Sequence, residues 1–216
     1  LIPPSGFLTD VDFSKLDMSR FALRRTECGG KVITTKKMGS NERTKSNIYK
    51  LQVLNEKDIE NFLRDGFLHI KGFYKGEELK TFKKFVDEVQ NKPERVGGQM
   101  MWFEEGMQGQ GRILNRVEDF CRHHKGMSEL FTANQSKMRQ ACADLAGEDV
   151  ILFKDKINFK LPGGDGFKAH QDQQAGWGNY IGWFLSIAVF ADPSTIENGC
   201  LEIAGGLHKN GLLGKE

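Results

Sequence analysis

The chain has 216 residues, of which 38% are hydrophobic and 10% are aromatic. This composition is typical of an ordinary globular domain and excludes a disordered or fibrous protein. The 31 Lys and Arg residues nearly balance the 29 Asp and Glu residues, which leaves a net charge of +2. We therefore expect neither nucleic acid nor a membrane as the main partner.

Cysteine spacing and hydropathy indicate the cellular compartment in which the protein is expected. The 4 cysteines lie far apart, so the sequence contains neither a zinc knuckle nor a CxxC redox motif. A disulfide framework is not expected in a chain of this length. No apolar run reaches membrane-spanning length, and no signal-peptide pattern opens the sequence. We expect a cytoplasmic protein.

Residues 1–54 differ in character from the rest of the chain. They lack a sustained hydrophobic period and include the stretch GGKVITTKKMGSNERTKSN, which is rich in Gly, Ser, Thr and Lys. Such a composition is typical of a loop or an arm over a domain. We therefore predict an N-terminal arm or loop region at 1–54 and a single domain at 55–216.

Helical patterns open the predicted domain. Asn55 can cap a helix because Asp58 follows three residues later, and Gly66 can end that helix. The sequence FLHIKGF, residues 67–73, predicts a short strand. Apolar residues at helical spacing then predict a second helix over 77–91.

The middle of the chain alternates between glycine-rich and helical patterns. Residues 95–111 are rich in glycine and predict a mobile loop, whose Met and Trp side chains either cover a site or dock on the domain. Helical spacing recurs over 118–131 and over 136–145. We expect His123 and His124 on the surface near a helix end, where cations are favourable.

Strand patterns dominate after residue 150. Residues 150–161, 181–192 and 199–204 read as strands, with turn signals such as PGGDG and DPSTIENG between them. Helices come first and strands follow, without βαβ alternation. This order predicts an α+β fold with a sandwich or barrel as its second part.

The strand predicted at 150–161 has an apolar face, interrupted by Asp155, and a polar face that includes Lys154, Lys156 and Asn158. A polar face is typical of solvent exposure, but the interior of a barrel that binds a small anion shows the same pattern. Both interpretations stay open, and the motif that follows the strand favours the second. The ammonium group of Lys156 would suit an anion.

The segment FKAHQDQQAGW contains His170 and Asp172, whose spacing lets both side chains point to the same side of an extended backbone. An imidazole and a carboxylate are two members of the two-His, one-carboxylate set that holds non-haem Fe(II). A second His is still required. An HxD pair occurs often by chance, and a His in a domain is more often structural than a metal ligand.

The surrounding sequence is more specific. INFKLPGG, GFKAHQDQQAGW and ADPSTIENGCLEIAGGLHK together resemble the phytanoyl-CoA dioxygenase (phytanoyl-CoA hydroxylase, PhyH-like) family of Fe(II)- and 2-oxoglutarate-dependent oxygenases. LRDGFLHIKGFY is similar to the opening helix and strand of that family. The resemblance runs from about residue 55 to the end. It implies an α+β protein with a double-stranded β-helix (jelly roll, cupin-like) core and N-terminal helices packed on it.

The resemblance also implies a ligand set for the iron. His170 and Asp172 match the family's HxD ligands, and Gln171 between them would point away from the metal. His208 lies in a GxH turn that does not supply a ligand in this family. The family's distal His, and an Arg that pairs with the far carboxylate of 2-oxoglutarate, are expected after Glu216, together with the remaining C-terminal strands.

Further positions are implied for the cosubstrate and the substrate. By resemblance, Asn158 contacts 2-oxoglutarate, and Lys156 and Trp177 line the cosubstrate or substrate pocket. We assign Lys156 to 2-oxoglutarate and Trp177 to the substrate. Lys154, on the same lysine-rich strand face, is a further candidate for binding an anionic substrate. The implied reaction consumes O₂ and 2-oxoglutarate, releases succinate and CO₂, and hydroxylates a C–H bond. Asp172 argues against the halogenating branch of the family, which has a small residue at that position.

The substrate is the least defined part of the resemblance, because relatives act on acyl-CoA thioesters, small zwitterions and phosphonates. Arg112 and Arg116 would suit a compact anionic substrate, and surface positions fit them equally well. We expect a small-molecule substrate that is polar or phosphonate-like. The alternative is a non-catalytic β-barrel binding protein with an incomplete metal site. The oligomeric state is not predicted.

Overall fold

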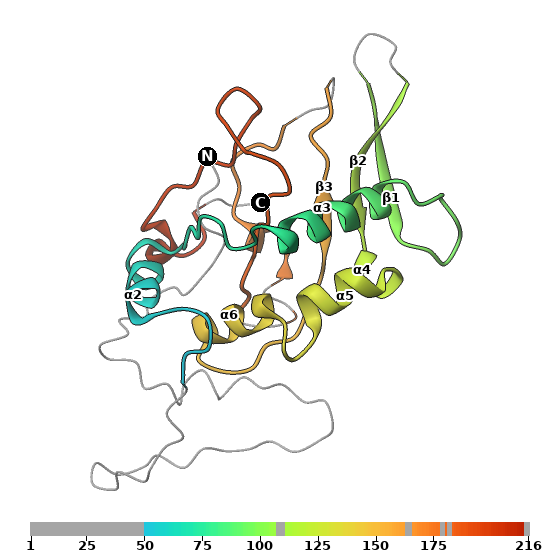
Figure 1. Ribbon diagram of the computed structural model, residues 1–216. Helices are drawn as coiled ribbons and strands as arrows, with labels where there is room; N and C mark the ends of the chain where they lie inside the picture. Colours follow the sequence, from blue (N-terminus) through green and yellow to red (C-terminus); the bar gives the residue numbers. More distant parts are fainter. Residues whose placement is uncertain (1–49, 107–110, 163–165, 178–179, 181–182, 214–216) are drawn as a thin grey trace, which may run out of the picture. The chain divides into compact units, whose positions relative to one another are not determined.

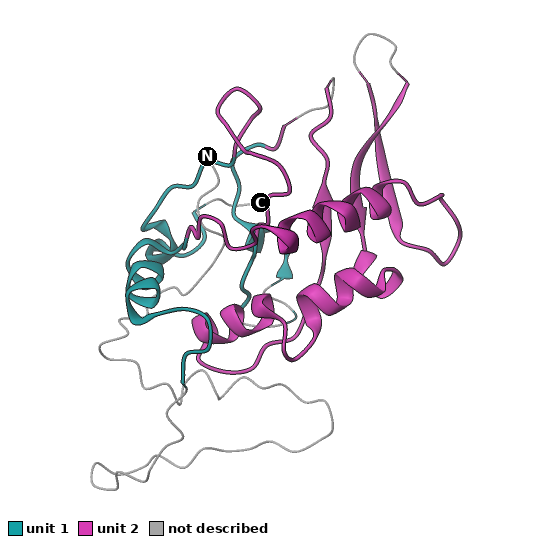
Figure 2. Cartoon of the chain, in the orientation of Figure 1, with its two compact units in different colours: residues 1–68, 168–187, 201–216 teal, residues 69–167, 188–200 magenta. Residues whose placement is uncertain are grey.

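The computed structural model describes residues 50–106, 111–162, 166–177, 180 and 183–213. The chain divides into two compact units (Figure 2). Unit 1 is formed by residues 1–68, 168–187 and 201–216, and unit 2 by residues 69–167 and 188–200. Residues 1–49 of the predicted arm lie outside the described residues, so the boundary after residue 54 stays a prediction.

Helix α2, Glu56–Asp65, opens the described part of unit 1 (Figure 1). The Asn55 side chain accepts a hydrogen bond from the Asp58 amide, and the Asp58 carboxylate accepts one from the Asn55 amide, both at 3.1 Å. This capping box satisfies two amides that the helix cannot pair itself. Gly66, at φ 78°, ends the helix in the left-handed conformation that glycine adopts without strain. The helix predicted between Asn55 and Gly66 is confirmed.

Unit 2 contains the other α-helices of the described chain, namely α3 (Glu77–Gln90), α4 (Phe120–His123), α5 (Lys125–Thr132) and α6 (Lys137–Ala146). The helices predicted over 77–91 and 136–145 are confirmed. The pattern over 118–131 is interrupted, because His124 is extended (φ −140°, ψ 102°) and separates α4 from α5. Within the described residues, no helix combines the length and apolar character needed to cross a membrane.

A three-stranded antiparallel sheet in the order β1-β2-β3 forms the other half of unit 2 (Figure 1). The strands are β1 (Met100–Glu105), β2 (Arg112–Glu118) and β3 (Lys156–Asn158). The loop predicted over 95–111 is therefore wrong for Met100–Glu105. The glycines lie on either side of this segment, and between them its aromatic residues pair with β2. Residues 107–110 lie outside the described residues.

Several predicted strands differ from the structure. Within 150–161 only Lys156–Asn158 is a strand, and the described residues of 67–73 and 183–192 have no strand pairing. In 199–204 a single bridge residue, Ile203, is present. Period-2 alternation indicates a face but does not supply the partner strand that the hydrogen bonds require. The sheet and helices agree with an α+β class, whereas a double-stranded β-helix is not seen in the described residues.

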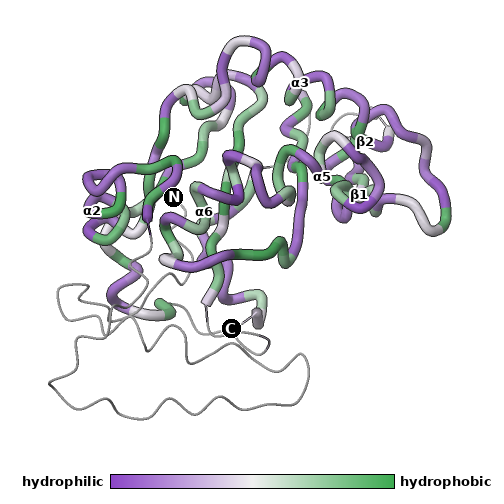
Figure 3. The backbone as a smooth tube through the Cα atoms, turned by 60° about the horizontal axis from the view of Figure 1, so that its bottom comes forward, coloured by the Kyte–Doolittle hydropathy of each residue, from purple (hydrophilic) through white to green (hydrophobic). Residues whose placement is uncertain are grey.

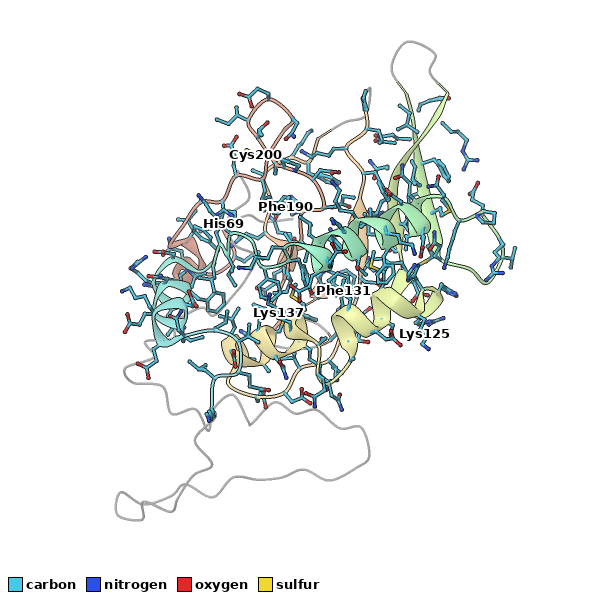
Figure 4. All side chains as sticks on the ribbon, in the orientation of Figure 1. His69, Lys125, Phe131, Lys137, Phe190 and Cys200 are labelled. Atoms are coloured by element: carbon cyan, nitrogen blue, oxygen red, sulfur yellow. The ribbon has the colours of Figure 1, made fainter. Side chains whose placement is uncertain are left out.

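The core of unit 2 lies between its helices and the sheet. It consists of Phe82, Val89, Leu114, Val117, Phe120, Cys121 and Met127. Phe131, labelled in Figure 4, packs edge-on against Phe82 and Phe120, with ring centroids 6.0 and 6.5 Å apart. The trace of α3 carries both hydrophobic and hydrophilic residues in Figure 3, and Phe82 and Val89 of α3 and Met127 of α5 are the members that these helices contribute to the core.

We expect Phe82→Ala to lower the free energy of unfolding by about 3–5 kcal/mol, because it leaves a cavity in this core. Phe82 is 4% exposed, whereas Val96 is fully exposed and makes Val96→Ala a control. Urea unfolding at neutral pH measures both. Equal stability of the two variants would contradict the packing described here.

Candidate functional site

The candidate metal ligands lie side by side in unit 1. His170 precedes the short helix η2 (Asp172–Ala175), and Gln171 between the two residues is extended (φ −107°, ψ 132°). Nε2 of His170 lies 3.5 Å from Oδ1 of Asp172, and about a third of each side chain is exposed. The spacing thus brings an imidazole nitrogen and a carboxylate oxygen together at an accessible position.

Each of these side chains has a second partner that orients it. Nδ1 of His170 donates a hydrogen bond to the Lys168 carbonyl at 2.6 Å, because a carbonyl can only accept. With the proton at Nδ1, the neutral ring presents a lone pair at Nε2, which faces Asp172. The Ser186 hydroxyl donates to Oδ2 of Asp172 at 2.5 Å. Outer partners of this kind fix the tautomer and the orientation of metal ligands.

Gln171, between the two candidate ligands, attaches this part of the chain to residues 211–213. Its side chain is 2% exposed, donates to the Gly211 carbonyl at 2.9 Å and accepts from the Leu213 amide at 2.7 Å. Its own amide donates to the Gln174 side chain at 2.9 Å. Gln171 was expected to point away from the candidate ligands, but its hydrogen bonds to Gly211 and Leu213 were not predicted. A polar residue between two other polar residues gives no signal of burial in the sequence.

His208 lies at the end of α2 and not beside the candidate ligands. It is 4% exposed, and its Nε2 donates to the Leu63 carbonyl at 3.2 Å. A Cβ on Gly66 would lie 2.1 Å from Nδ1 of His208, so the close approach requires glycine at this position. Among the described residues no third His, Cys, Asp or Glu joins a group that could hold a metal.

The expectation that His124 is a surface residue is wrong. His124 is 9% exposed, and its Nδ1 accepts a hydrogen bond from the Met127 amide at 3.0 Å, which caps α5. Its Nε2 donates to Glu88 at 2.8 Å, and this hydrogen bond lowers the pKa of the Glu88 carboxyl. The neighbouring His123 is half-buried and lies 3.5 Å from Asp119. Both histidines thus have structural partners in unit 2.

The predicted cosubstrate and substrate residues divide between the units. Lys156 and Asn158 are exposed on β3, and Lys154 just before this strand lies 3.2 Å from Glu118. These three residues belong to unit 2. Trp177 belongs to unit 1, where its ring lies 6.1 Å from that of Tyr180. Lys154, Lys156 and Asn158 therefore lie on or just before β3 in unit 2, and Trp177 lies in unit 1, shortly after the candidate ligands in the chain.

Comparison with protein families identifies the chain. A family model described as phytanoyl-CoA dioxygenase (PhyH) matches residues 62–213, which include both candidate ligands. The chain belongs to the phytanoyl-CoA dioxygenase family. This confirms the resemblance that the HxD segment indicated. No solved structure matches the chain.

Three proteins similar to the chain carry names that refer to phosphorus compounds. The chain is 36% identical to a 2-aminoethylphosphonate dioxygenase of the uncultured bacterium HF130_AEPn_1, over 70% of the chain and 57% of the relative. It is 32% identical to a methylphosphonate hydroxylase of Gimesia maris, over 74% of the chain and 59% of the relative. It is 26% identical to a "Probable alpha-ketoglutarate-dependent hypophosphite dioxygenase" of Stutzerimonas stutzeri, over 68% and 51%. The chain thus spans less than two thirds of the length of these relatives.

The buried ring of His208 makes a testable contribution to pH-dependent stability. Burial lowers its pKa, as does Lys209, whereas the Leu63 carbonyl and Asp65 act in the opposite direction. Below a pH of about 6.5 the unfolded chain binds a proton that the folded chain excludes. The stability that neutral His208 provides is therefore complete above this pH and falls as the pH drops.

We expect His208→Asn, which cannot titrate, to lose less stability between pH 7.5 and pH 5.5 (roughly one unit either side of the free imidazole pKa) than the unchanged protein. Urea midpoints at the two pH values measure the difference. His69→Asn replaces an exposed histidine, labelled in Figure 4, and serves as the control. The same pH dependence in His208→Asn and in the unchanged protein would rule out the neutral buried ring.

Proposed function

We propose that the protein is an Fe(II)- and 2-oxoglutarate-dependent dioxygenase that hydroxylates a C–H bond of a small anionic metabolite, with a phosphonate as the favoured class. The observation that carries the proposal is the approach of Nε2 of His170 to Oδ1 of Asp172 within the family-matched residues. The family's jelly-roll fold, a double-stranded β-helix, is part of the same proposal.

The donor set fits ferrous iron. A neutral imidazole nitrogen and a carboxylate oxygen are two of the three ligands in the facial set of non-haem Fe(II) oxygenases. His170 and Asp172 supply both from one short segment, and their outer partners already hold each group. A second His is needed to complete the set, and the described residues do not place one beside this pair.

The residues of the chain have distinct tasks in this proposal. Bound iron would supply the oxidising chemistry that couples loss of CO₂ from 2-oxoglutarate to hydroxylation of the substrate. The Lys168 carbonyl keeps the proton of His170 at Nδ1, so Nε2 stays available as a donor atom. The Ser186 hydroxyl binds Oδ2 of Asp172, and the other carboxylate oxygen, Oδ1, faces His170. The protein thereby orients its ligands before any group binds.

Binding of the organic molecules is proposed for the polar residues of the sequence motif. The amide of Asn158 and the ammonium group of Lys156 would donate to 2-oxoglutarate oxygens, since both are exposed on β3. Lys154 and Trp177 would contact the substrate. Two relatives are named for phosphonates. Together with the cationic side chains, these names favour a phosphonate over an apolar acyl group.

Anaerobic addition of Fe(II) and 2-oxoglutarate to the full-length protein tests the proposal. We expect a weak visible charge-transfer band, followed by succinate release when O₂ and methylphosphonate or 2-aminoethylphosphonate are added. His170→Ala and Asp172→Ala should abolish the band and the turnover, and His69→Ala should preserve both. A full-length protein that binds these compounds without a band would instead be a small-molecule binding protein.

Ser186→Ala tests the outer hydrogen bond separately. We expect its affinity for Fe(II) to fall about 10- to 100-fold, because Asp172 loses the partner that orients it. Anaerobic Fe(II) titration provides the measurement. Ser128→Ala removes a hydroxyl that pairs with Thr132 in unit 2 and should leave the affinity unchanged. Equal Fe(II) affinity in both variants would exclude this orienting role.

A further inference from the structure

Three charged side chains come together on the unit 2 sheet. Glu118 on β2 is 5% exposed. Its Oε1 lies 3.0 Å from Nε of Arg116, and its Oε2 lies 3.2 Å from Nζ of Lys154. The side chains of the two cations remain 29% and 39% exposed. A buried carboxylate therefore joins two cations that reach the surface.

The strand register places this cluster beside the predicted cosubstrate residues. Arg116 is the cross-strand partner of Asn158, and Glu118 is the partner of Lys156. Residues directly opposite each other in an antiparallel pair project from the same face of the sheet. Val117, between Arg116 and Glu118, is fully buried in the core and projects from the other face. Arg116, Glu118, Lys156 and Asn158 thus share one polar face.

This face carries more positive charge than a structural ion pair needs. A buried carboxylate must be paired, and one cation would neutralise it. Here Arg116 and Lys154 both contact Glu118, and Lys156 lies opposite it. Two cations contact one carboxylate and a third cation lies opposite it, so positive charges outnumber negative ones among these four residues. This sign suits a small anion.

The two arginines of β2 differ in how their donors are used. Arg112 forms a two-pronged ion pair with Glu94, at 3.2 and 3.3 Å. A single carboxylate thus occupies its guanidinium fork. The buried Nε of Arg116 lies near Glu118 but has no aligned hydrogen bond within the described chain. A guanidinium has five N–H donors, more than this one contact uses. The ring of Trp102, 5.2 Å from the Arg116 guanidinium carbon, supports one side of that group.

We propose that Arg116 and Lys154 bind the phosphonate group of the substrate and that Glu118 is the positioning residue that holds both. The identity of the ligand rests on the proposed function. A planar guanidinium and an ammonium group together match the oxygens of a tetrahedral oxyanion. The carboxylates of 2-oxoglutarate share this chemistry, so the experiment must separate the two ligands.

A pair of charge-matched double variants provides the test. Arg116→Gln with Glu118→Gln removes one cation and one anion from the proposed subsite. Arg112→Gln with Glu94→Gln removes the same charges from the satisfied pair on the same strand. Calorimetry on the full-length protein, loaded anaerobically with Fe(II), measures the dissociation constants of methylphosphonate and of 2-oxoglutarate. Because this readout is binding, it does not depend on turnover.

We expect the dissociation constant for methylphosphonate to rise about ten-fold or more in the Arg116 double variant, since charge-assisted hydrogen bonds are lost. The Arg112 double variant should bind as the unchanged protein does, and the constant for 2-oxoglutarate should stay the same in both. Unchanged methylphosphonate binding in the Arg116 variant would overturn the subsite, even if the enzyme turns over normally. A selective loss of 2-oxoglutarate binding would also overturn it.

The single variant Glu118→Gln tests the positioning role. It keeps both cations but removes the carboxylate that holds them, so we expect weaker methylphosphonate binding. Tighter binding would mean that Glu118 only reduces the positive charge, and would overturn the role proposed for it. Binding of methylphosphonate without any succinate release would support the subsite while refuting the proposed activity.

Discussion

The side chain of Gln171 ties the candidate ligand segment to the chain around residues 211–213. Both ends of its amide are used, one as donor to the Gly211 carbonyl and one as acceptor from the Leu213 amide. A buried amide with satisfied hydrogen bonds is stable, whereas an unsatisfied one costs about 1–3 kcal/mol. The segment is not paired into a strand. These hydrogen bonds therefore hold it in the conformation on which the approach of His170 to Asp172 depends.

Polar groups at buried positions also organise unit 2. The carboxylate of Asp155 accepts a hydrogen bond from the Cys121 amide at 2.7 Å, at the beginning of α4. This contact explains why a charged residue interrupts the apolar face of the segment before β3. Glu118 is buried between Arg116 and Lys154 for a related reason, because its charge is compensated there. In both cases a carboxylate links elements that are far apart in the sequence.

Local signals made part of this structure predictable. The capping box at Asn55 and the left-handed Gly66 involve residues within a few positions, so the sequence contains the whole interaction. The facing of His170 and Asp172 follows equally from backbone alternation. The pairing of β1 with β2 and the burial of His124 depend on distant partners, which composition does not reveal. The glycine content of residues 95–111 led to the wrong prediction of a loop, because the glycines lie on either side of β1 and not within it.

In both units a buried residue lies between two candidate functional residues in the chain. Gln171 is extended and buried, whereas the candidate ligands on either side of it, His170 and Asp172, each keep about a third of the side chain exposed. Where Val117 enters the core, Arg116 and Glu118 must lie on the other face of the sheet. Fixing one inward residue thus helps to orient the two functional residues that flank it in the chain. A substitution of Gln171 or Val117 would therefore change the orientation of the functional side chains next to it, although neither residue is proposed to bind iron or substrate.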